Sequence, residues 1–278
     1  MLTRNSKSLL QRWLNAVGYR ISKIEGLPPD FTQDERALVL NVREFTATSP
    51  ERIIALKTAV EFIVRNKVPG SLVECGVWRG GSVMTIALTL LKLGETNRNL
   101  YLFDTFEGMT PPTAEDYDVH GQPASTIFSR LARKTGGSDW CCATVEEVRS
   151  NIASTGYPMK RVHLIKGRVE ETIPNPVLTF PIALVRLDTD WYGSTKHELI
   201  HLFPLLGIGG VLMLDDYGTW AGARKAIDEY LKDVAITAYL HRIDSSGRLL
   251  LNMDSSKLGT EIQSNSWMAS SERSADTK

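Results

Sequence analysis

The sequence of 278 residues has no excess of charge of either sign, because 32 lysines and arginines balance 32 aspartates and glutamates. It also contains no block of five or six like charges. Proteins that bind nucleic acids or anionic membranes usually present such a basic surface. The composition therefore argues against binding to nucleic acids or anionic membranes, and it favours a small-molecule ligand.

Cysteine is scarce and long apolar runs are missing. The three cysteines, Cys75, Cys141 and Cys142, cannot all pair, and the adjacent two could join only through a strained ring. No segment approaches the roughly 18 apolar residues of a membrane span, and the first residues lack the pattern of a secretory signal. We therefore expect a cytoplasmic protein without a disulfide framework.

The first 24 residues carry five basic side chains and no acid, while apolar residues recur at helical spacing. This pattern predicts a basic amphipathic helix that packs on its own subunit or on a neighbouring one. A transit-like or surface-binding helix is the alternative. We expect residues 1–47 to form a helical lid or oligomerisation segment, and the exposed apolar face favours a homo-oligomer, either a dimer or a tetramer.

The rest of the chain alternates between helical and extended patterns. A proline-initiated helix spans about 48–65, and another apolar helix spans 83–93. Further helices are expected near 124–134, 143–154 and 221–231, and strands at 71–77, 99–106, 162–169, 182–189, 210–216, 236–243 and 248–252. Such alternation predicts one α/β domain over 48–252, with a seven-stranded, mostly parallel sheet that ends in an antiparallel hairpin. Residues 253–278 read as a disordered tail.

A glycine-rich turn follows the first strand, in residues 73–82 (VECGVWRGGS). Trp78 occupies a position where the dinucleotide fingerprint requires glycine, so a diphosphate fits poorly. An amino-acid-like ligand fits better, because its carboxylate can accept hydrogen bonds from backbone N–H groups and the Ser82 hydroxyl, while Glu74 faces its ammonium group. The alternative is that glycines such as Gly76 only make a tight turn.

The second strand ends at Asp104, which lies 23 residues beyond Gly81. A carboxylate in this place can accept two hydrogen bonds from a ribose diol. A glycine turn and a ribose-binding acid without space for a diphosphate together indicate S-adenosylmethionine as the cofactor. Taken alone, Asp104 could equally be a solvated turn residue.

Acidic residues also follow two later strands. Asp188 ends the strand over 182–189, and Asp215 and Asp216 end the strand over 210–216. If these strands are neighbours, three carboxylates meet and repel one another unless a cation lies between them. An incomplete, oxygen-only set of ligands favours Mg²⁺. The alternative is a set of separate, solvent-facing turn acids.

Four segments resemble the macrocin O-methyltransferase family in order and spacing: residues 73–82, 103–109 (FDTFEGM), 187–195 (LDTDWYGST) and 214–217 (LDDY). The resemblance covers about residues 46–252. It implies a class I methyltransferase fold, Rossmann-like, with a helical N-terminal lid and a mobile loop over 107–125. It also implies that S-adenosylmethionine and Mg²⁺ serve the methylation of sugar or phenolic hydroxyls of natural products. The residues that it assigns are Asp188, Asp215 and Asp216 to the metal, and Glu74, Gly76, Gly81, Ser82, Asp104 and Thr105 to the cofactor.

Two residues, Asp190 and His120, are candidates for the general base. The more distantly similar catechol O-methyltransferases place a lysine where this sequence has Trp191. The resemblance favours Asp190, which shares the direction of Asp188 only if the strand pleat continues. His120 is second, because imidazole titrates near neutrality. We expect Mg²⁺ to chelate two neighbouring oxygens of a hydroxylated small-molecule acceptor. A nicotinamide (NAD) dehydrogenase and a non-catalytic, methyltransferase-like interaction protein remain alternatives.

Overall fold

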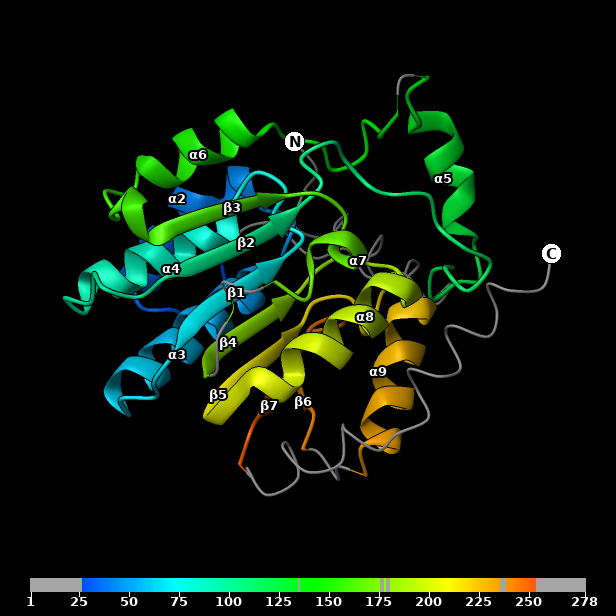
Figure 1. Ribbon diagram of the computed structural model, residues 1–278. Helices are drawn as coiled ribbons and strands as arrows, with labels where there is room; N and C mark the ends of the chain where they lie inside the picture. The colour runs from blue at the N-terminus through cyan, green and yellow to red at the C-terminus, as the bar shows by residue number, and fades with distance from the viewer. Residues whose placement is uncertain (1–26, 135, 176–177, 179–180, 236–238, 254–278) are drawn as a thin grey trace, which may run out of the picture.

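The computed structural model describes residues 27–253 except 135, 176–177, 179–180 and 236–238. The expectations for the basic N-terminal helix and for the tail beyond Met253 therefore lie outside the described residues. Within these limits the chain forms a seven-stranded sheet in the order β3-β2-β1-β4-β5-β7-β6 (Figure 1). The strands are β1 (Ser71–Cys75), β2 (Leu100–Asp104), β3 (Val162–Lys166), β4 (Ile182–Leu187), β5 (Leu206–Leu214), β6 (His241–Arg242) and β7 (Arg248–Leu251).

The sheet is mixed, as the sequence predicts. Strands β1 to β5 pair in parallel, whereas β7 runs antiparallel to both β5 and β6. The terminal hairpin thus lies at one edge, but its second strand is inserted between β5 and the short β6. The class of fold predicted from the alternating pattern is confirmed.

Helices cover both faces of the sheet (Figure 1). One face carries α3 (Pro50–Arg65), α4 (Gly81–Lys92) and α6 (Val145–Ala153), with α2 (Gln33–Val42) packed outside them; the other carries α7 (Val169–Thr172), α8 (Tyr192–Leu202) and α9 (Ala221–Asp233). Helix α5 (Ala124–Leu131) stands apart from both layers. Short 3₁₀ helices span Arg43–Phe45, Met159–Arg161 and Phe203–Leu205.

Local sequence signals set several helix starts. Ser49 caps α3 by accepting a hydrogen bond from the Arg52 backbone N–H, and Pro50 occupies the first turn, where its missing N–H costs nothing. Thr32 and Glu35 form a capping box that begins α2. Helix α2 then packs on Ile53 of α3 and Met84 of α4. The described part of the expected N-terminal segment is therefore a third layer on one face of the domain.

The core divides at the sheet. Leu72 and Leu102 point toward α3, α4 and α6, whereas their neighbours Val73 and Phe103 point toward α7, α8 and α9. Both sets are buried, which is why the strands read as continuous apolar runs. Burying each such side chain contributes roughly 1.5–3 kcal/mol before entropy is considered.

Several element boundaries differ from the predictions. The third strand ends at Lys166, and Val169 already begins α7. Strand β5 begins at Leu206, earlier than the predicted start at residue 210. The first half was missed because Gly207, Gly209 and Gly210 interrupt the apolar pattern on which the prediction was based. The strand expected over 236–243 contains two described strand residues, His241 and Arg242. In the part of the chain that the structure covers, no helix combines the length and apolarity of a membrane span.

Candidate active site

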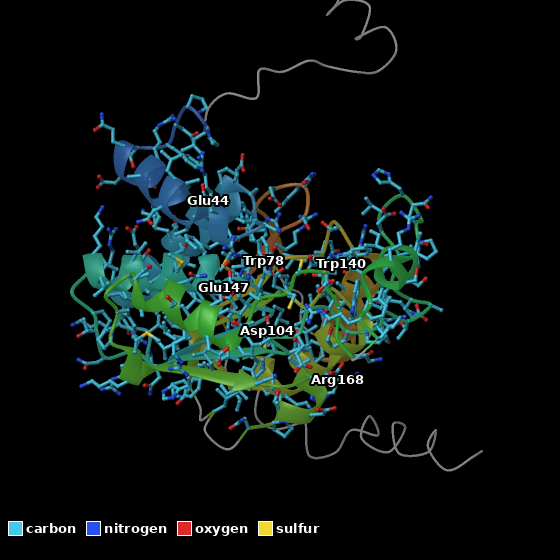
Figure 2. The ribbon with its side chains drawn as sticks, turned by 90° about the horizontal axis from the view of Figure 1, so that it is seen from above. Glu44, Trp78, Asp104, Trp140, Glu147 and Arg168 are labelled. Atoms are coloured by element: carbon cyan, nitrogen blue, oxygen red, sulfur yellow. The ribbon has the colours of Figure 1, made fainter. Side chains whose placement is uncertain are left out.

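A cavity of about 270 Å³ opens at the carboxyl ends of β1, β2, β4 and β5, where parallel sheets bind ligands. Its volume is near the lower end for small-molecule sites. In the view from above, Asp104 at the end of β2 lies between Trp78 and Arg168, which come from loops at this edge (Figure 2). Eight of the predicted site residues line the cavity: Gly76, Ser82, Asp104, Thr105, Asp188, Asp190, Asp215 and Asp216.

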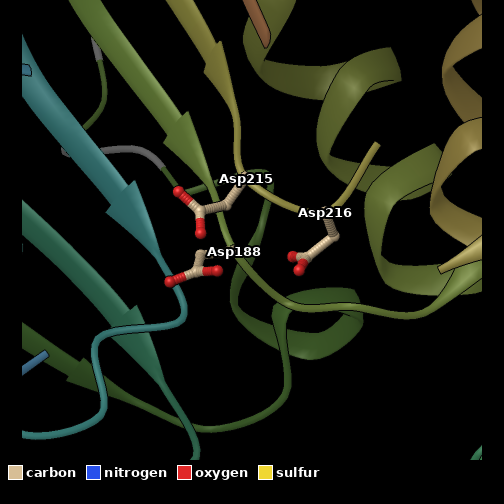
Figure 3. Close-up of side chains that lie close together, drawn as sticks. All are labelled: Asp188, Asp215 and Asp216. Carbon is tan, nitrogen blue, oxygen red and sulfur yellow. The ribbon is translucent and has the colours of Figure 1, made fainter. Parts of the chain in front are cut away.

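The three predicted metal ligands meet. Leu187 pairs with Leu214 across β4 and β5, so the residues that follow these two strands emerge side by side. One carboxylate oxygen from each of Asp188, Asp215 and Asp216 lies within 4.8 Å of the others (Figure 3). The expectation that neighbouring strands bring these acids together is confirmed.

Two arginines balance part of this negative charge. The guanidinium of Arg186, only 2% exposed, lies 2.8 Å from a Glu74 oxygen, 2.8 Å from an Asp188 oxygen and 2.7 Å from an Asp215 oxygen. Arg52 on α3 forms ion pairs with Asp215 and with Asp244. Two of the three predicted ligands therefore have a cationic partner.

Asp216 has a different environment. It forms no ion pair with any residue in the described ranges, and its Oδ2 atom is buried without a hydrogen-bond partner. A buried acceptor with an unused lone pair is costly unless a further group binds it. Together with the oxygen-only donors Asp188 and Asp215, it fits a hard divalent cation such as Mg²⁺.

The carboxyl groups of Asp188 and Asp216 resist ionisation. Burial raises the pKa of Asp188 and of Asp216 well above its ordinary value, and neighbouring acids add to the shift. Burial, followed by the charge of Asp188, raises the pKa of Asp190 to about 7. A bound cation would oppose these shifts by favouring the ionised carboxylates.

Asp190 reaches the cavity by a turn and not by the strand. Strand β4 ends at Leu187, so the pleat that would have aligned Asp190 with Asp188 does not continue. Instead Asp190 adopts a left-handed conformation with φ of 69°, and the Trp191 N–H donates to the Thr189 carbonyl at 2.8 Å. The turn places Asp190 in the cavity lining beside the three acids.

The glycine turn is built against this same segment. Gly76 has a φ of +80°, and a Cβ added to it would lie 1.9 Å from the Asp188 carbonyl oxygen. Asp104 then fixes the turn, because its carboxylate accepts hydrogen bonds from the N–H groups of Val77 (2.6 Å), Trp78 (3.1 Å) and, beyond β2, Phe106 (2.7 Å). Burial raises the pKa of Asp104 although these three bonds favour its charged form.

Three predicted site residues do not line the cavity. The Glu74 side chain is buried against Arg186, which donates to its Oε1 across β1 and β4, while its Oε2 is buried without a hydrogen-bond partner among the described residues. Gly81 lies against the backbone of Phe45, where a Cβ would come within 2.7 Å of the carbonyl carbon. His120 is exposed in the loop before α5. The structure therefore shows Glu74 in a buried ion pair and Gly81 against the backbone of Phe45, and it places His120 outside the cavity lining.

Other lining residues were not expected from the sequence. They come from the end of the first 3₁₀ helix and the loop after it, from α3, from the loop after β3 and the start of α7, from the interior of β4 and from the loop before α6: Phe45, Thr46, Ala47, Thr48, Arg52, Gly167, Arg168, Val169, Glu170, Arg186 and Cys141. A basic residue inside the apolar strand β4 was the one signal that could have indicated Arg186. The others approach the cavity through tertiary packing and carry no local motif.

Comparison with known proteins agrees with this geometry. The family model of macrocin O-methyltransferases (TylF) matches residues 22–250. The 8-demethyl-8-(2,3-dimethoxy-alpha-L-rhamnosyl)-tetracenomycin-C 4'-O-methyltransferase of Streptomyces olivaceus is 33% identical over 202 residues, which cover 73% of each chain. The demethyldecarbamoylnovobiocin O-methyltransferase of Streptomyces niveus is 31% identical over 198 residues, 71% of each chain.

Solved structures show the same fold. The O-methyltransferase NovP superposes with a TM-score of 0.67 at 28% identity, over 76% of this chain and 83% of that one. The calicheamicin methyltransferase CalS11 superposes with a TM-score of 0.55 at 19% identity, over 91% and 95% of the two chains, and so supports the fold alone. With most of its length matched, the chain is an S-adenosylmethionine-dependent O-methyltransferase and belongs to the macrocin O-methyltransferase family.

Proposed function

We propose that this enzyme methylates a hydroxyl group on a sugar or phenolic unit of a natural product, with Mg²⁺ held by Asp188, Asp215 and Asp216. The observation that carries the metal role is the convergence of three carboxylates around the buried, unpartnered Oδ2 of Asp216. The substrate class is supported by relatives, one of which is named as the 4'-O-methyltransferase of a rhamnosylated tetracenomycin.

The cofactor end of the cavity is assigned to the glycine turn. Gly76, Ser82, Asp104 and Thr105 line it, at the ends of β1 and β2 and the start of α4. We assign the amino-acid portion of S-adenosylmethionine to the backbone around Gly76 and the Ser82 hydroxyl, and its ribose to Asp104. When bound, S-adenosylmethionine supplies an electrophilic methyl group on a sulfonium sulfur.

Proton removal is assigned to Asp190. Its carboxylate lines the cavity beside the metal ligands, whereas His120 is exposed and outside the lining. A base in this position can accept the hydroxyl proton within the same cavity. Mg²⁺, when bound, supplies a positive charge that lowers the pKa of an acceptor hydroxyl. Arg186 meanwhile holds Asp188 and Asp215 in fixed positions through its buried ion pairs.

The acceptor side is assigned to the loop after β2. Gly108, Met109 and Thr110 line the cavity there. The loop is anchored at Asp116, a buried residue whose carboxylate accepts hydrogen bonds from the N–H groups of Thr113 (2.7 Å) and Tyr192 (2.8 Å). Residues 107–125 therefore have a fixed point at the start of α8, next to the acids, from which they can cover an acceptor and exclude water.

The function is tested by following radiolabelled methyl groups from S-adenosylmethionine to a panel of glycosylated and phenolic acceptors. We expect transfer to a hydroxyl in Mg²⁺-containing buffer, loss of transfer in excess chelator, and loss in Asp188→Ala. The control is Asp233→Asn, which changes an exposed acid on α9. This variant should keep both the methyl transfer and its sensitivity to chelator. Transfer that is indifferent to chelation and to Asp188→Ala would refute the metal role.

Two further proposals concern the whole enzyme. We propose a homo-oligomer, supported by the exposed Leu40 on α2 and by the apolar pattern of residues 1–24, and light scattering before and after deletion of those residues tests it. We also propose a cytoplasmic location, for which the small number of cysteines is the support. Cell fractionation with detection of the native protein tests the location.

A further inference from the structure

Glu198 on α8 is a buried carboxyl group to which the proposed chemistry assigns no role. Its side chain is 0% exposed. No basic side chain in the described part of the chain forms an ion pair with it. Burial raises the pKa of Glu198 well above its ordinary value. Burying a carboxyl group in a core costs free energy unless hydrogen bonds to that group compensate for the lost contacts with water.

The partner of Glu198 is the residue between two acids of the site. The Thr189 hydroxyl lies 3.0 Å from Oε1 and 3.1 Å from Oε2 of Glu198. The buried thiol of Cys75, at the end of β1, lies near the same carboxyl group, and burial and the charge of Glu198 raise its pKa. The hydrogen bonds of Glu198 join α8 to the segment that carries Asp188 and Asp190.

That segment contains a strained turn. Asp190 has a φ of 69°, and the Trp191 N–H bonds to the Thr189 carbonyl two residues back. A residue with a side chain adopts such a turn rarely, and it persists only when surrounding contacts hold it. The conformation is what turns Asp190 toward the cavity after β4 has ended.

Contacts hold the turn on both sides. Before it, the Asp188 N–H donates to the Cys75 carbonyl at 2.9 Å. After it, the Trp191 indole N–H donates to the Thr110 carbonyl at 2.9 Å, and the ring packs against Trp140 and Trp220. Within the turn itself, the Ser194 hydroxyl of α8 donates to the Thr189 carbonyl at 3.4 Å. The Thr189 side chain also reaches α8, and Glu198 is its partner there among the hydrogen bonds described for that hydroxyl.

We propose that Glu198 is a positioning residue, which holds Thr189 so that the strained turn directs the Asp190 carboxylate into the cavity beside the metal ligands. The catalytic consequence of this proposal rests on the proposed function. The contact itself does not, and it can be tested in the metal-free protein.

The experiment compares two pairs of variants. Thr189→Val removes the hydroxyl at nearly constant shape, whereas Thr189→Ser keeps it. Glu198→Met removes the carboxyl group, whereas Glu198→Gln keeps an acceptor oxygen. The matched control is Thr89→Val on α4, which removes another buried hydroxyl, one that bonds to the Thr85 carbonyl at 2.7 Å.

The first readout is hydrogen exchange of the backbone amides in residues 188–192 without metal. We expect exchange to be about tenfold faster in Thr189→Val and in Glu198→Met, and close to that of the unaltered protein in Thr189→Ser, Glu198→Gln and Thr89→Val. The double variant Thr189→Val with Glu198→Met should be no faster than either single one, because both remove the same contact. Unchanged exchange in Thr189→Val, or additive effects, would overturn the proposal.

The second readout is Mn²⁺ binding by isothermal titration, together with turnover. Because Thr189→Val loses this contact, we expect its Mn²⁺ affinity, its turnover or both to fall by about tenfold. Thr189→Ser keeps the hydroxyl and should retain both. Wild-type turnover and affinity in Thr189→Val would overturn the proposal. Absence of methyl transfer in the unaltered enzyme would instead contradict the proposed function, and the exchange measurement would still decide whether Glu198 holds the turn.

Discussion

The guanidinium of Arg186, inside β4, and the carboxylate of Asp188, which directly follows that strand, lie 2.8 Å apart. Arg186 is the last basic group before the acidic end of the strand, and it is almost completely buried. It also bonds to Glu74 on β1 and to Asp215 after β5, so one cation joins three neighbouring strands. The acid cluster is thereby organised before any metal binds.

Replacing Arg186 with an uncharged residue should lower the free energy of unfolding of the domain. Arg186→Met leaves Glu74, Asp188 and Asp215 without their shared partner, and breaking a buried ion pair from one side costs about 3–5 kcal/mol. Urea denaturation should show this loss, whereas Arg224→Met, which removes an exposed ion pair with Asp228, should change stability little. Equal stability of the two variants would contradict the role assigned to Arg186.

Mg²⁺ should stabilise the enzyme through Asp216. A ligand that binds only the folded state raises the free energy of unfolding, so we expect the midpoint of thermal unfolding to rise with Mg²⁺ concentration. Asp216→Asn should remove most of this rise, because it replaces the buried oxygen that lacks a partner. Asp233→Asn should leave the rise intact. A midpoint that ignores Mg²⁺ in the unaltered protein would contradict the metal site.

The sequence alone predicted the parts of the site that depend on topology. Asp188, Asp215 and Asp216 follow two apolar strands of a parallel sheet, so they were expected to meet if those strands were neighbours, and β4 and β5 do pair. The same reasoning placed Gly76 and Asp104 at one edge. The approximate places of these strands were readable from periodicity, whereas their order in the sheet comes from the structure.

The sequence could not predict which long-range partner each side chain would choose. Glu74 follows the glycine-turn pattern, but the register of β1 and β4 places it opposite Arg186, and the ion pair determines its orientation. Asp190 reaches the cavity through a left-handed turn, a conformation that Asp adopts only occasionally and that no motif in the sequence predicts. Glu198 looks like an ordinary helix residue until Thr189 is found against it. These features depend on tertiary packing, which overrides local preference.

The close approach of Gly76 to Asp188 should make this glycine irreplaceable. In Gly76→Ala the new Cβ would meet the Asp188 carbonyl oxygen at 1.9 Å, in addition to the strain of a φ of +80°. Gly94→Ala is a matched control, because Gly94 has a φ of +72° and no atom within 4 Å of the added carbon. We expect about 1–2 kcal/mol of destabilisation at Gly94 and a larger loss at Gly76, with loss of S-adenosylmethionine binding. Thermal unfolding and isothermal titration measure both. Equal effects would contradict the packing argument.

Asp104 should contribute to cofactor affinity through the turn that it holds. Asp104→Ala leaves the N–H groups of Val77, Trp78 and Phe106 without their acceptor, and each unsatisfied buried donor costs about 1–3 kcal/mol. We expect S-adenosylmethionine to bind at least tenfold more weakly by isothermal titration. Asp118→Ala removes a similar acceptor from two N–H groups in an exposed loop and should leave this affinity unchanged. Equal affinities in the two variants would contradict the role of Asp104.

The hairpin between β6 and β7 should give the enzyme an acid-sensitive contact at Asp244. Burial alone would raise the pKa of Asp244, but hydrogen bonds from Ser49, Gly247 and Ser246 and the charge of Arg52 outweigh it, and the net pKa is lowered. A carboxyl group with a lowered pKa stabilises the folded state above its unfolded pKa, and the stabilisation disappears as the pH falls through the folded pKa. The unaltered protein should therefore be more stable than Asp244→Asn at neutral pH, and the difference should shrink below about pH 4. Urea denaturation across this pH range measures it. A stability difference between the two proteins that stays constant down to pH 2 would contradict this prediction. It would show that Asp244 acts through packing and that its charge does not link α3 to the hairpin.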